Sequence, residues 1–156
     1  VRRPAVDERE LTETGQLDTV DGLVGDNWRA RGSSSTPDKS ANPEAQITVM
    51  NARAAQLVAQ DADRWPLAGD QLYVDFDLSE ENIPPGTRLA IGDAVLEVSA
   101  LPHNGCNKFV ARFGLDAMKF VNSPVGKQLH LRGINAKVVQ AGAIRVGDGV
   151  KKVSGD

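Results

Sequence analysis

The hydrophobic pattern of the chain is dominated by short segments that alternate between apolar and polar positions. Residues 71–78 alternate over their whole length, which predicts a half-buried strand. The short apolar run 47–50 predicts a buried strand, and the runs 87–91 and 94–100, joined by a Gly-Asp pair, predict a hairpin. The strand over 71–78 is expected to carry Leu72, Val74 and Phe76 on one face and Tyr73, Asp75 and Asp77 on the other.

Helical periodicity is confined to two stretches. Asn51 is placed to cap a short helix over 52–60, which is rich in alanine. From Cys106 onward the apolar spacing changes to that of a helix, and Gly114 is expected to divide this segment into two short helices. The apolar stripe, which we expect to pack on the sheet, consists of Cys106, Phe109, Val110, Phe113, Ala117, Phe120 and Val121.

The last third of the chain predicts three more strands, over 128–132, 136–140 and 144–146, separated by glycines. About six short strands with turns between them indicate a mainly β protein, either a barrel or a sandwich. Residues 29–46 are dominated by Arg, Gly, Ser, Pro and Asn and predict a long loop, of the kind that can close over a site.

Composition narrows the class of protein. The chain has 156 residues, 40% hydrophobic and 25% charged, which is typical of one folded domain. It contains no apolar run of membrane-spanning length and no signal-like N-terminal run, so we expect no membrane contact. One cysteine excludes an intrachain disulfide and a four-cysteine zinc cage, and we predict a cytoplasmic, reducing setting.

The charge is distributed unevenly along the chain. The formal net charge is −3, but residues 102–152 contain nine Lys or Arg against two Asp or Glu. Such a segment is either a solvated basic face or a surface that holds an anion. Because the protein is acidic overall and only 4% aromatic, a small phosphorylated ligand fits better than nucleic acid.

Cys106 is the residue most suited to chemistry. It lies at a predicted strand-to-helix junction, where backbone N–H groups and nearby Lys108 and Arg112 lower a thiol pKa. The alternative is that Cys106 is a small core residue. His103 is interpreted as a loop side chain and His130 as a structural residue within a strand.

Two polar clusters have alternative interpretations. Arg132 and Asn135 flank a glycine at a strand end and offer donors to a phosphate or a pterin-like ring, unless this segment is a plain turn. Four carboxylates near residue 78 are interpreted as a solvated face rather than an acid–base pair. They are Asp75, Asp77, Glu80 and Glu81.

The linear order of several motifs resembles the MOSC domain, named for the C-terminal part of molybdenum-cofactor sulfurase. The motifs are Gly-Leu-Val-Gly-Asp (22–26), Ile-Thr-Val-Met-Asn (47–51), Pro-Leu-Ala-Gly-Asp-Gln-Leu (66–72), Pro-Gly-Thr (85–87) with Ile-Gly (91–92), Cys-Asn-Lys-Phe (106–109), Leu-Arg-Gly-Ile-Asn-Ala (131–136) and Ile-Arg-Val-Gly-Asp (144–148). The resemblance runs from about residue 20 to 150. It implies a closed or partly closed β-barrel-like fold with a few short helices.

The resemblance also implies a site. Cys106 matches the family cysteine that ligates molybdenum in some members or is thought to carry sulfur. Lys108, Arg112, Arg132 and Asn135 then become candidate donors to the phosphate and pterin of a molybdenum cofactor.

The expected organisation is an N-terminal segment over 1–20, a MOSC domain over 21–150 and a C-terminal tail over 151–156. Relatives usually have a further strand before the region that matches residues 1–4, so the chain looks short at its start. It also lacks the pyridoxal-phosphate-dependent desulfurase domain of the fused sulfurases, so pyridoxal phosphate is expected in a partner if it is needed at all.

Three functions are compatible with these features. The first is cofactor binding through Cys106, in sulfur or cofactor transfer or in molybdenum-dependent reduction of N-hydroxylated compounds, the latter with an electron-transfer partner. The second is a persulfide carrier without bound metal, supplied by a cysteine desulfurase. The third is a non-catalytic interaction module. Whether the chain is an enzyme, an oxidoreductase or a sulfur transferase, is left open by the sequence.

Overall fold

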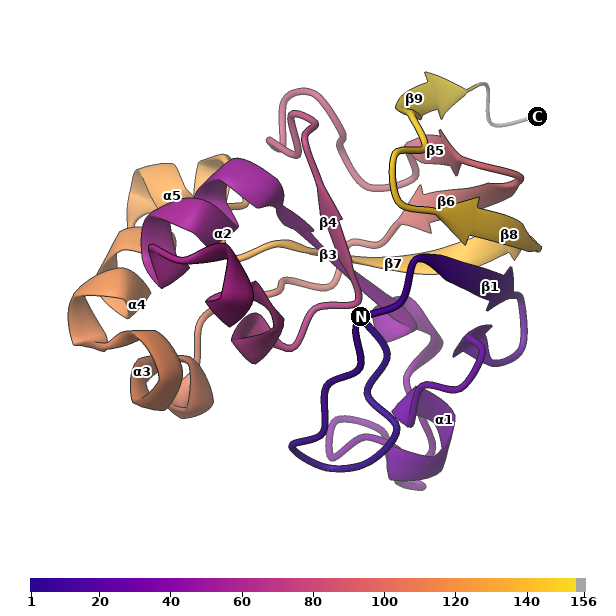
Figure 1. The fold of residues 1–156 in the computed structure, drawn as a ribbon, viewed down its shortest axis with the longest axis horizontal. Coiled ribbons are helices and arrows are strands. Elements are labelled where there is room, and N and C mark those ends of the chain that lie inside the picture. The colour runs from indigo at the N-terminus through magenta and orange to yellow at the C-terminus, as the bar shows by residue number, and fades with distance from the viewer. Residues whose placement is uncertain (154–156) are drawn as a thin grey trace.

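Strands form most of the molecule in the computed structural model, which describes residues 1–153 (Figure 1). A six-stranded sheet curls into a half-barrel, and a three-stranded sheet lies beside it. All neighbouring strands are antiparallel except β3 and β4, which are parallel. The larger sheet has the order β4 (Leu72–Val74), β3 (Ile47–Asn51), β7 (Ile134–Gln140), β6 (Ala94–Val98), β5 (Arg88–Ile91) and β9 (Val150–Val153); the smaller has the order β2 (Gly22–Leu23), β1 (Thr14–Asp18) and β8 (Gly142–Arg145). The fold is therefore mainly β and partly closed, as expected.

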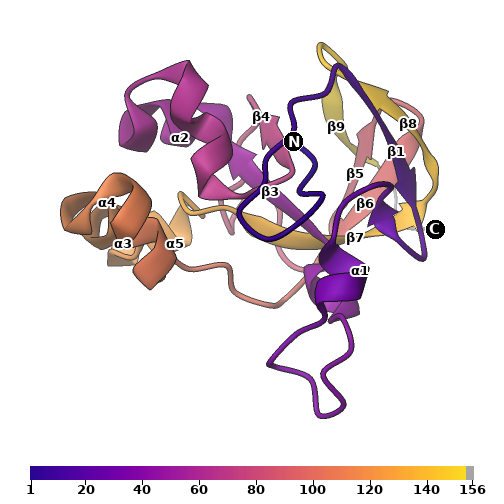
Figure 2. The ribbon, with the colours of Figure 1, turned by 60° about the horizontal axis from the view of Figure 1, so that its bottom comes forward.

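Helices gather mainly at the β3–β4 end of the large sheet, on the left of Figure 1. This helical layer contains α2 (Ala52–Ala59), the 3₁₀ helix η2 (Ala62–Ala68), α3 (Asn107–Phe113), α4 (Leu115–Val121) and α5 (Pro124–Gln128). A second short pair, α1 (Trp28–Arg31) and the 3₁₀ helix η1 (Pro43–Ala45), borders the predicted loop, whose middle projects from the body in Figure 2. No helix among residues 1–153 has the length and apolar character to cross a membrane.

The core consists of two clusters that meet at β3. Ile47 and Val49 belong to the cluster inside the curled sheets, whereas Met50 belongs to the cluster under the helical layer. On β4, Leu72 packs against the first cluster and Tyr73 against the second. Tyr73 therefore lies on the face opposite Leu72 and Val74, as predicted, but at Tyr73 that face packs against the helical layer, so the two faces of β4 meet two different apolar clusters.

Most local predictions are confirmed. Asn51 caps α2, its side-chain oxygen accepting hydrogen bonds from the N–H groups of Arg53 and Ala54. The predicted hairpin is β5–β6, and Gly114, with a φ of 95°, separates α3 from α4. These features depend on contacts between near neighbours, which a sequence pattern records directly.

Three predictions about elements are wrong. Residues 128–132 are not a strand. Ser123 caps α5, its hydroxyl accepting a hydrogen bond from the N–H of Gly126, and the helix ends at Gln128, so the residues after it form a turn. His130 consequently lies in a turn with a φ of 52°, and its Nδ1 lies 2.6 Å from the carbonyl oxygen of Leu78. The pattern over 71–78 forms a ladder only over Leu72–Val74, since beyond Val74 the chain leaves β3.

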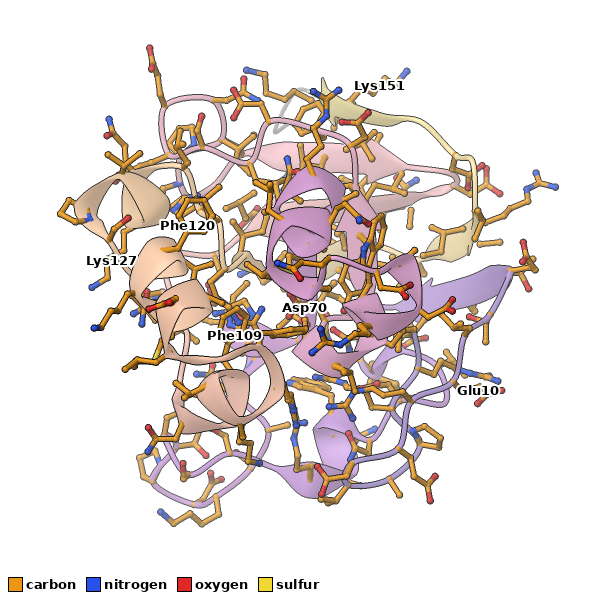
Figure 3. The ribbon with its side chains drawn as sticks, turned by 60° about the vertical axis from the view of Figure 1, so that its left-hand side comes forward. Glu10, Asp70, Phe109, Phe120, Lys127 and Lys151 are labelled. Atoms are coloured by element: carbon orange, nitrogen blue, oxygen red, sulfur yellow. The ribbon has the colours of Figure 1, made fainter. Side chains whose placement is uncertain are left out.

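The helical stripe packs on the sheet only in part, since its buried members share a cluster with Met50 of β3 and Tyr73 of β4. Phe109 is buried in the cluster under the helical layer, with Ala54 and Val58 of α2 in the same cluster, whereas Phe120 is 45% exposed. The main neighbours of α4 are α3 and α5 rather than a strand. In Figure 3, Phe109 lies near the centre and Phe120 farther out in the helical layer.

Both ends of the chain join sheets. Residues 151–153, expected as part of a tail, complete β9 and pair with β5. Residues 154–156 of that expected tail lie outside the described residues. The N-terminal segment contains β1, which pairs with β8 near the other end of the chain.

Candidate functional site

Cys106 immediately precedes α3 and is exposed. Partial burial raises the pKa of the Cys106 thiol, but the backbone N–H groups of Phe109 and Lys108, followed by the charges of Arg132 and Arg112, outweigh it. The pKa of the thiol is therefore below its usual value. A lowered pKa increases the fraction of thiolate, the form that attacks electrophiles and binds soft metals.

A basic pocket of about 180 Å³ lies close to this thiol. It is lined by several parts of the chain: the N-terminal segment, the two ends of α1, Thr48 of β3, the end of η2 with the turn after it, the region from His103 to α3, and Arg132. The charged or titratable residues that line the basic pocket are Arg3, Asp7, Arg9, Arg31, Asp70, His103, Lys108, Arg112 and Arg132.

Asp70 is the buried anchor of the basic pocket and lies in the middle of Figure 3. One of its oxygens accepts a hydrogen bond from Nη1 of Arg132 at 2.7 Å, and the other lies 2.9 Å from Nε2 of His103. Burial raises the pKa of Asp70, but Arg132 and His103 outweigh burial and bring it down to about 2. Asp70 is therefore an anion throughout the physiological range.

Arg132 is held from several sides. In addition to its bond to Asp70, its Nη2 donates to the carbonyl oxygen of Ala68 at 2.9 Å, and its guanidinium lies 5.2 Å from the centre of the Phe109 ring. The side chain is about nine-tenths buried, yet its Nε has no hydrogen-bond partner among the described residues. An unpaired buried donor costs free energy, so this N–H is a ready site for an acceptor.

The basic pocket carries more positive than negative charge. Arg3 forms an ion pair with the buried Asp26, and Arg132 with Asp70. Among residues 1–153, Arg9 and Lys108 form no ion pair. Burial, then the charges of Arg112 and Arg3, lower the pKa of Arg9, which shows that the guanidinium groups repel one another. Such a concentration of uncompensated cations favours an anionic ligand.

The structure brings most of the candidate residues together. Lys108, Arg112 and Arg132 line the basic pocket beside Cys106. Asn135 does not line it. Its side-chain N–H₂ donates to the carbonyl oxygens of Leu101 and Pro102, both at 3.2 Å, and so fixes the segment that leads to His103. The roles of all five residues in binding stay predictions.

Sequence reasoning missed the arginines at the start of the chain. Five arginines fall within the first 31 residues, but the surrounding acids made this half of the chain net negative. The five are Arg2, Arg3, Arg9, Arg29 and Arg31. The acids do not neutralise the basic pocket because many of them face solvent, as Asp21 does in its exposed pair with Arg29.

The acidic residues near the end of β4 do not belong to the basic pocket. Asp75 forms an exposed ion pair with Arg53, and Asp77 accepts from the backbone N–H of Ser79, as expected of a solvated acidic face. Within residues 1–153 there is no group of three or more His, Cys, Asp or Glu arranged to hold a metal ion.

A partly closed β-barrel with a basic pocket beside one cysteine defines the class of protein. Residues 36–151 match the family model of the MOSC domain, so the chain belongs to the MOSC domain family. This family is associated with molybdenum-cofactor binding. A comparison with curated protein sequences finds no significant match.

Solved structures share the fold. YiiM from Escherichia coli is 19% identical with a TM-score of 0.61, the match covering 99% of this chain and 67% of YiiM. The YuaD protein from Bacillus subtilis is 15% identical with a TM-score of 0.57, covering 90% of this chain and 85% of YuaD. A hypothetical protein is 21% identical with a TM-score of 0.61, covering 92% of this chain. This chain spans only 62% of that protein's length.

Proposed function

We propose that the basic pocket binds a molybdenum cofactor and that the Cys106 thiolate is the protein ligand to its metal. The observation that carries the proposal is the combination of a cysteine of lowered pKa with a basic pocket lined by Arg132, whose buried Nε has no hydrogen-bond partner among the described residues. Membership of a family associated with this cofactor supports it.

The residues present fit such a group. Molybdenum cofactors combine a soft-metal centre with an anionic phosphate, so they need a thiolate and several cationic donors. Cys106 supplies the first, and Lys108, Arg112 and Arg132 supply the second, joined by Arg9. Bound, the cofactor supplies redox chemistry, for example for reducing N-hydroxylated compounds.

The chain's own residues have separate roles in this proposal. Backbone N–H groups at the start of α3 lower the pKa of the Cys106 thiol and so favour its thiolate form. The guanidinium of Arg132 is fixed by Asp70 and Ala68, so it binds with little loss of side-chain entropy. Because the chain carries no flavin, haem or iron–sulfur ligand set in its sequence, reduction requires an electron-donating partner.

The test is elemental analysis of the protein purified from molybdate-supplemented cells. We expect near-stoichiometric molybdenum in the wild type and its loss in Cys106→Ala. Lys127→Ala, which removes a cation of α5 outside the basic pocket, is the matched control and should retain the metal. Equal molybdenum in wild type and Cys106→Ala would refute the role of Cys106 as ligand.

A second function, sulfur transfer, is favoured by the exposure of Cys106. The Cys106 thiolate would attack the outer sulfur of a desulfurase persulfide, forming a Cys106 persulfide and releasing the desulfurase thiolate. Mass spectrometry after incubation with a cysteine desulfurase and cysteine should then show the addition of one sulfur atom. If Cys106 carried neither a metal nor a persulfide in these tests, the result would favour a non-catalytic interaction module.

A further inference from the structure

The His103 ring is held with one edge in the protein and the other toward solvent. Its Nε2 lies 2.9 Å from Asp70, and a Cβ placed on Gly133 would lie 3.0 Å from its Cδ2, so this edge faces Asp70 and Gly133. Nδ1 lies on the opposite edge of the ring. Among residues 1–153 it has no hydrogen-bond partner, and it is not a buried unpaired atom. The ring itself lines the basic pocket.

Asp70 decides which nitrogen carries the proton of the neutral ring. Its carboxylate accepts hydrogen bonds only, so Nε2 keeps its proton and Nδ1 presents a lone pair. When the ring takes up a second proton, Nδ1 becomes an N–H donor and the ring becomes a cation. Only this protonated form can donate a hydrogen bond to an anion in the basic pocket.

The charged groups around His103 favour that change when an anion binds. Asp70 and its partner Arg132 lie against the inner edge, and the thiol of Cys106 is three residues along the chain. The other charged groups that line the same pocket are Arg3, Asp7, Arg9, Arg31, Lys108 and Arg112. A bound dianion favours the protonated ring by its charge and accepts the new N–H.

We infer that His103 is an anion-binding residue of the basic pocket, positioned by Asp70, and that it takes up a proton from solvent when a dianionic group binds. The inference rests on the proposed function only in requiring that the basic pocket binds an anion. It assigns a role to a side chain that makes no contact with the metal in the proposal. It also makes anion affinity depend on pH, because proton uptake and anion binding promote each other equally.

Sulfate is the appropriate probe, since it stays a dianion across the pH range of the test. Isothermal titration calorimetry of the purified protein between pH 6 and 8.5 should show affinity falling by up to about tenfold per pH unit at the alkaline end. His103→Gln should bind more weakly and depend less on pH than the wild type. The dependence that remains is expected from the nearby Cys106 thiol, whose pKa is lowered. His103→Lys, a permanent cation, should restore the affinity at pH 8.

Nuclear magnetic resonance gives a direct readout, because the chain has only two histidines. Sulfate should keep His103 protonated to higher pH while leaving the titration of His130 unchanged, since His130 is bonded to Leu78 and lies outside the basic pocket. In Asp70→Asn, we expect weaker sulfate binding even though a negative charge has been removed. Stronger sulfate binding by Asp70→Asn would refute the positioning role of Asp70. If Asp70→Asn does not fold, the two His103 variants still test whether His103 binds the anion.

Sulfate affinity that is independent of pH and unchanged in His103→Gln would overturn the inference but leave the anion-binding pocket intact. No sulfate binding by the wild type at any pH would overturn the inference together with the anionic part of the proposed function. Molybdenum content, measured separately, distinguishes these outcomes from failure of the Cys106 ligand.

Discussion

The ion pair between Asp70 and Arg132 should make a measurable, pH-dependent contribution to stability. Asp70 is 1% exposed, and its pKa falls from the usual 3.8 to about 2 in the folded protein. Each pH unit of such a difference corresponds to about 1.4 kcal/mol, so the ionised form stabilises the fold by about 2 kcal/mol. Asn mimics the shape of the protonated carboxyl group, and Asp70→Asn should therefore cost at least about 2 kcal/mol at pH 7.

The sign of the pH dependence follows from the direction of the shift. Because the folded pKa lies below the unfolded one, the contribution is fully present above the unfolded value of 3.8 and is lost as pH falls through the folded value of about 2. The difference between wild type and Asp70→Asn should therefore shrink by about 1 kcal/mol between pH 7 and pH 3.

Urea unfolding followed by tryptophan fluorescence measures these free energies, with Trp28 buried in the folded protein. Asp75→Asn is the matched control, because the Asp75–Arg53 pair is exposed and should contribute less than about 1 kcal/mol. If Asp70→Asn were as stable as the wild type at pH 7, or if the difference stayed constant down to pH 3, the reasoning would be refuted.

Three further predictions concern single residues. Iodoacetamide should alkylate Cys106 with a rate that rises at a pH below the usual range for thiols, because the pKa of Cys106 is lowered; a rate that rises only in the usual range would contradict this. Phe109→Ala should cost about 3–5 kcal/mol in urea unfolding and Phe120→Ala about 1 kcal/mol or less, since only Phe109 is buried. Gly133→Ala should lower the melting temperature, as its Cβ would lie 2.6 Å from the carbonyl oxygen of Val49 at a φ of 126°. Gly149→Ala should leave the melting temperature unchanged, because a Cβ at Gly149 would lie within 4 Å of no other atom. Equal melting temperatures for both variants would refute the argument.

The sequence predicted elements well where one local signal was sufficient. The Asn51 cap, the β5–β6 turn and the break at Gly114 each depend on residues within a few positions of one another. The strand predicted over 128–132 is wrong because its apolar residues belong to the turn after α5. Ser123 and Pro124 are the signal that starts this helix, and this signal was overlooked. Periodicity does not reveal which surface a stripe will meet, so it assigned Phe120 to the core.

Some residues of the candidate site could be predicted from the sequence, whereas others were found only in the structure. Sequence alone singled out Cys106 and its neighbours Lys108 and Arg112, because a thiol before a helix is affected by the N–H groups and cations of that helix. Asp70 and Arg132 are 62 residues apart, and no spacing rule connects them. Only the tertiary fold brings this pair together, because the segment just before β7 lies against the end of η2, where Arg132 also donates to Ala68.

By itself, then, the sequence determined several local elements, the MOSC motifs and the position of the single cysteine. The tertiary structure alone decided that arginines from an acidic N-terminal segment line the basic pocket, that Asp70 pairs with Arg132 there, and that His103 lies against Asp70. The physical reason is that electrostatic interactions depend on distance and burial in space, and neither is encoded in the order of charges along the chain.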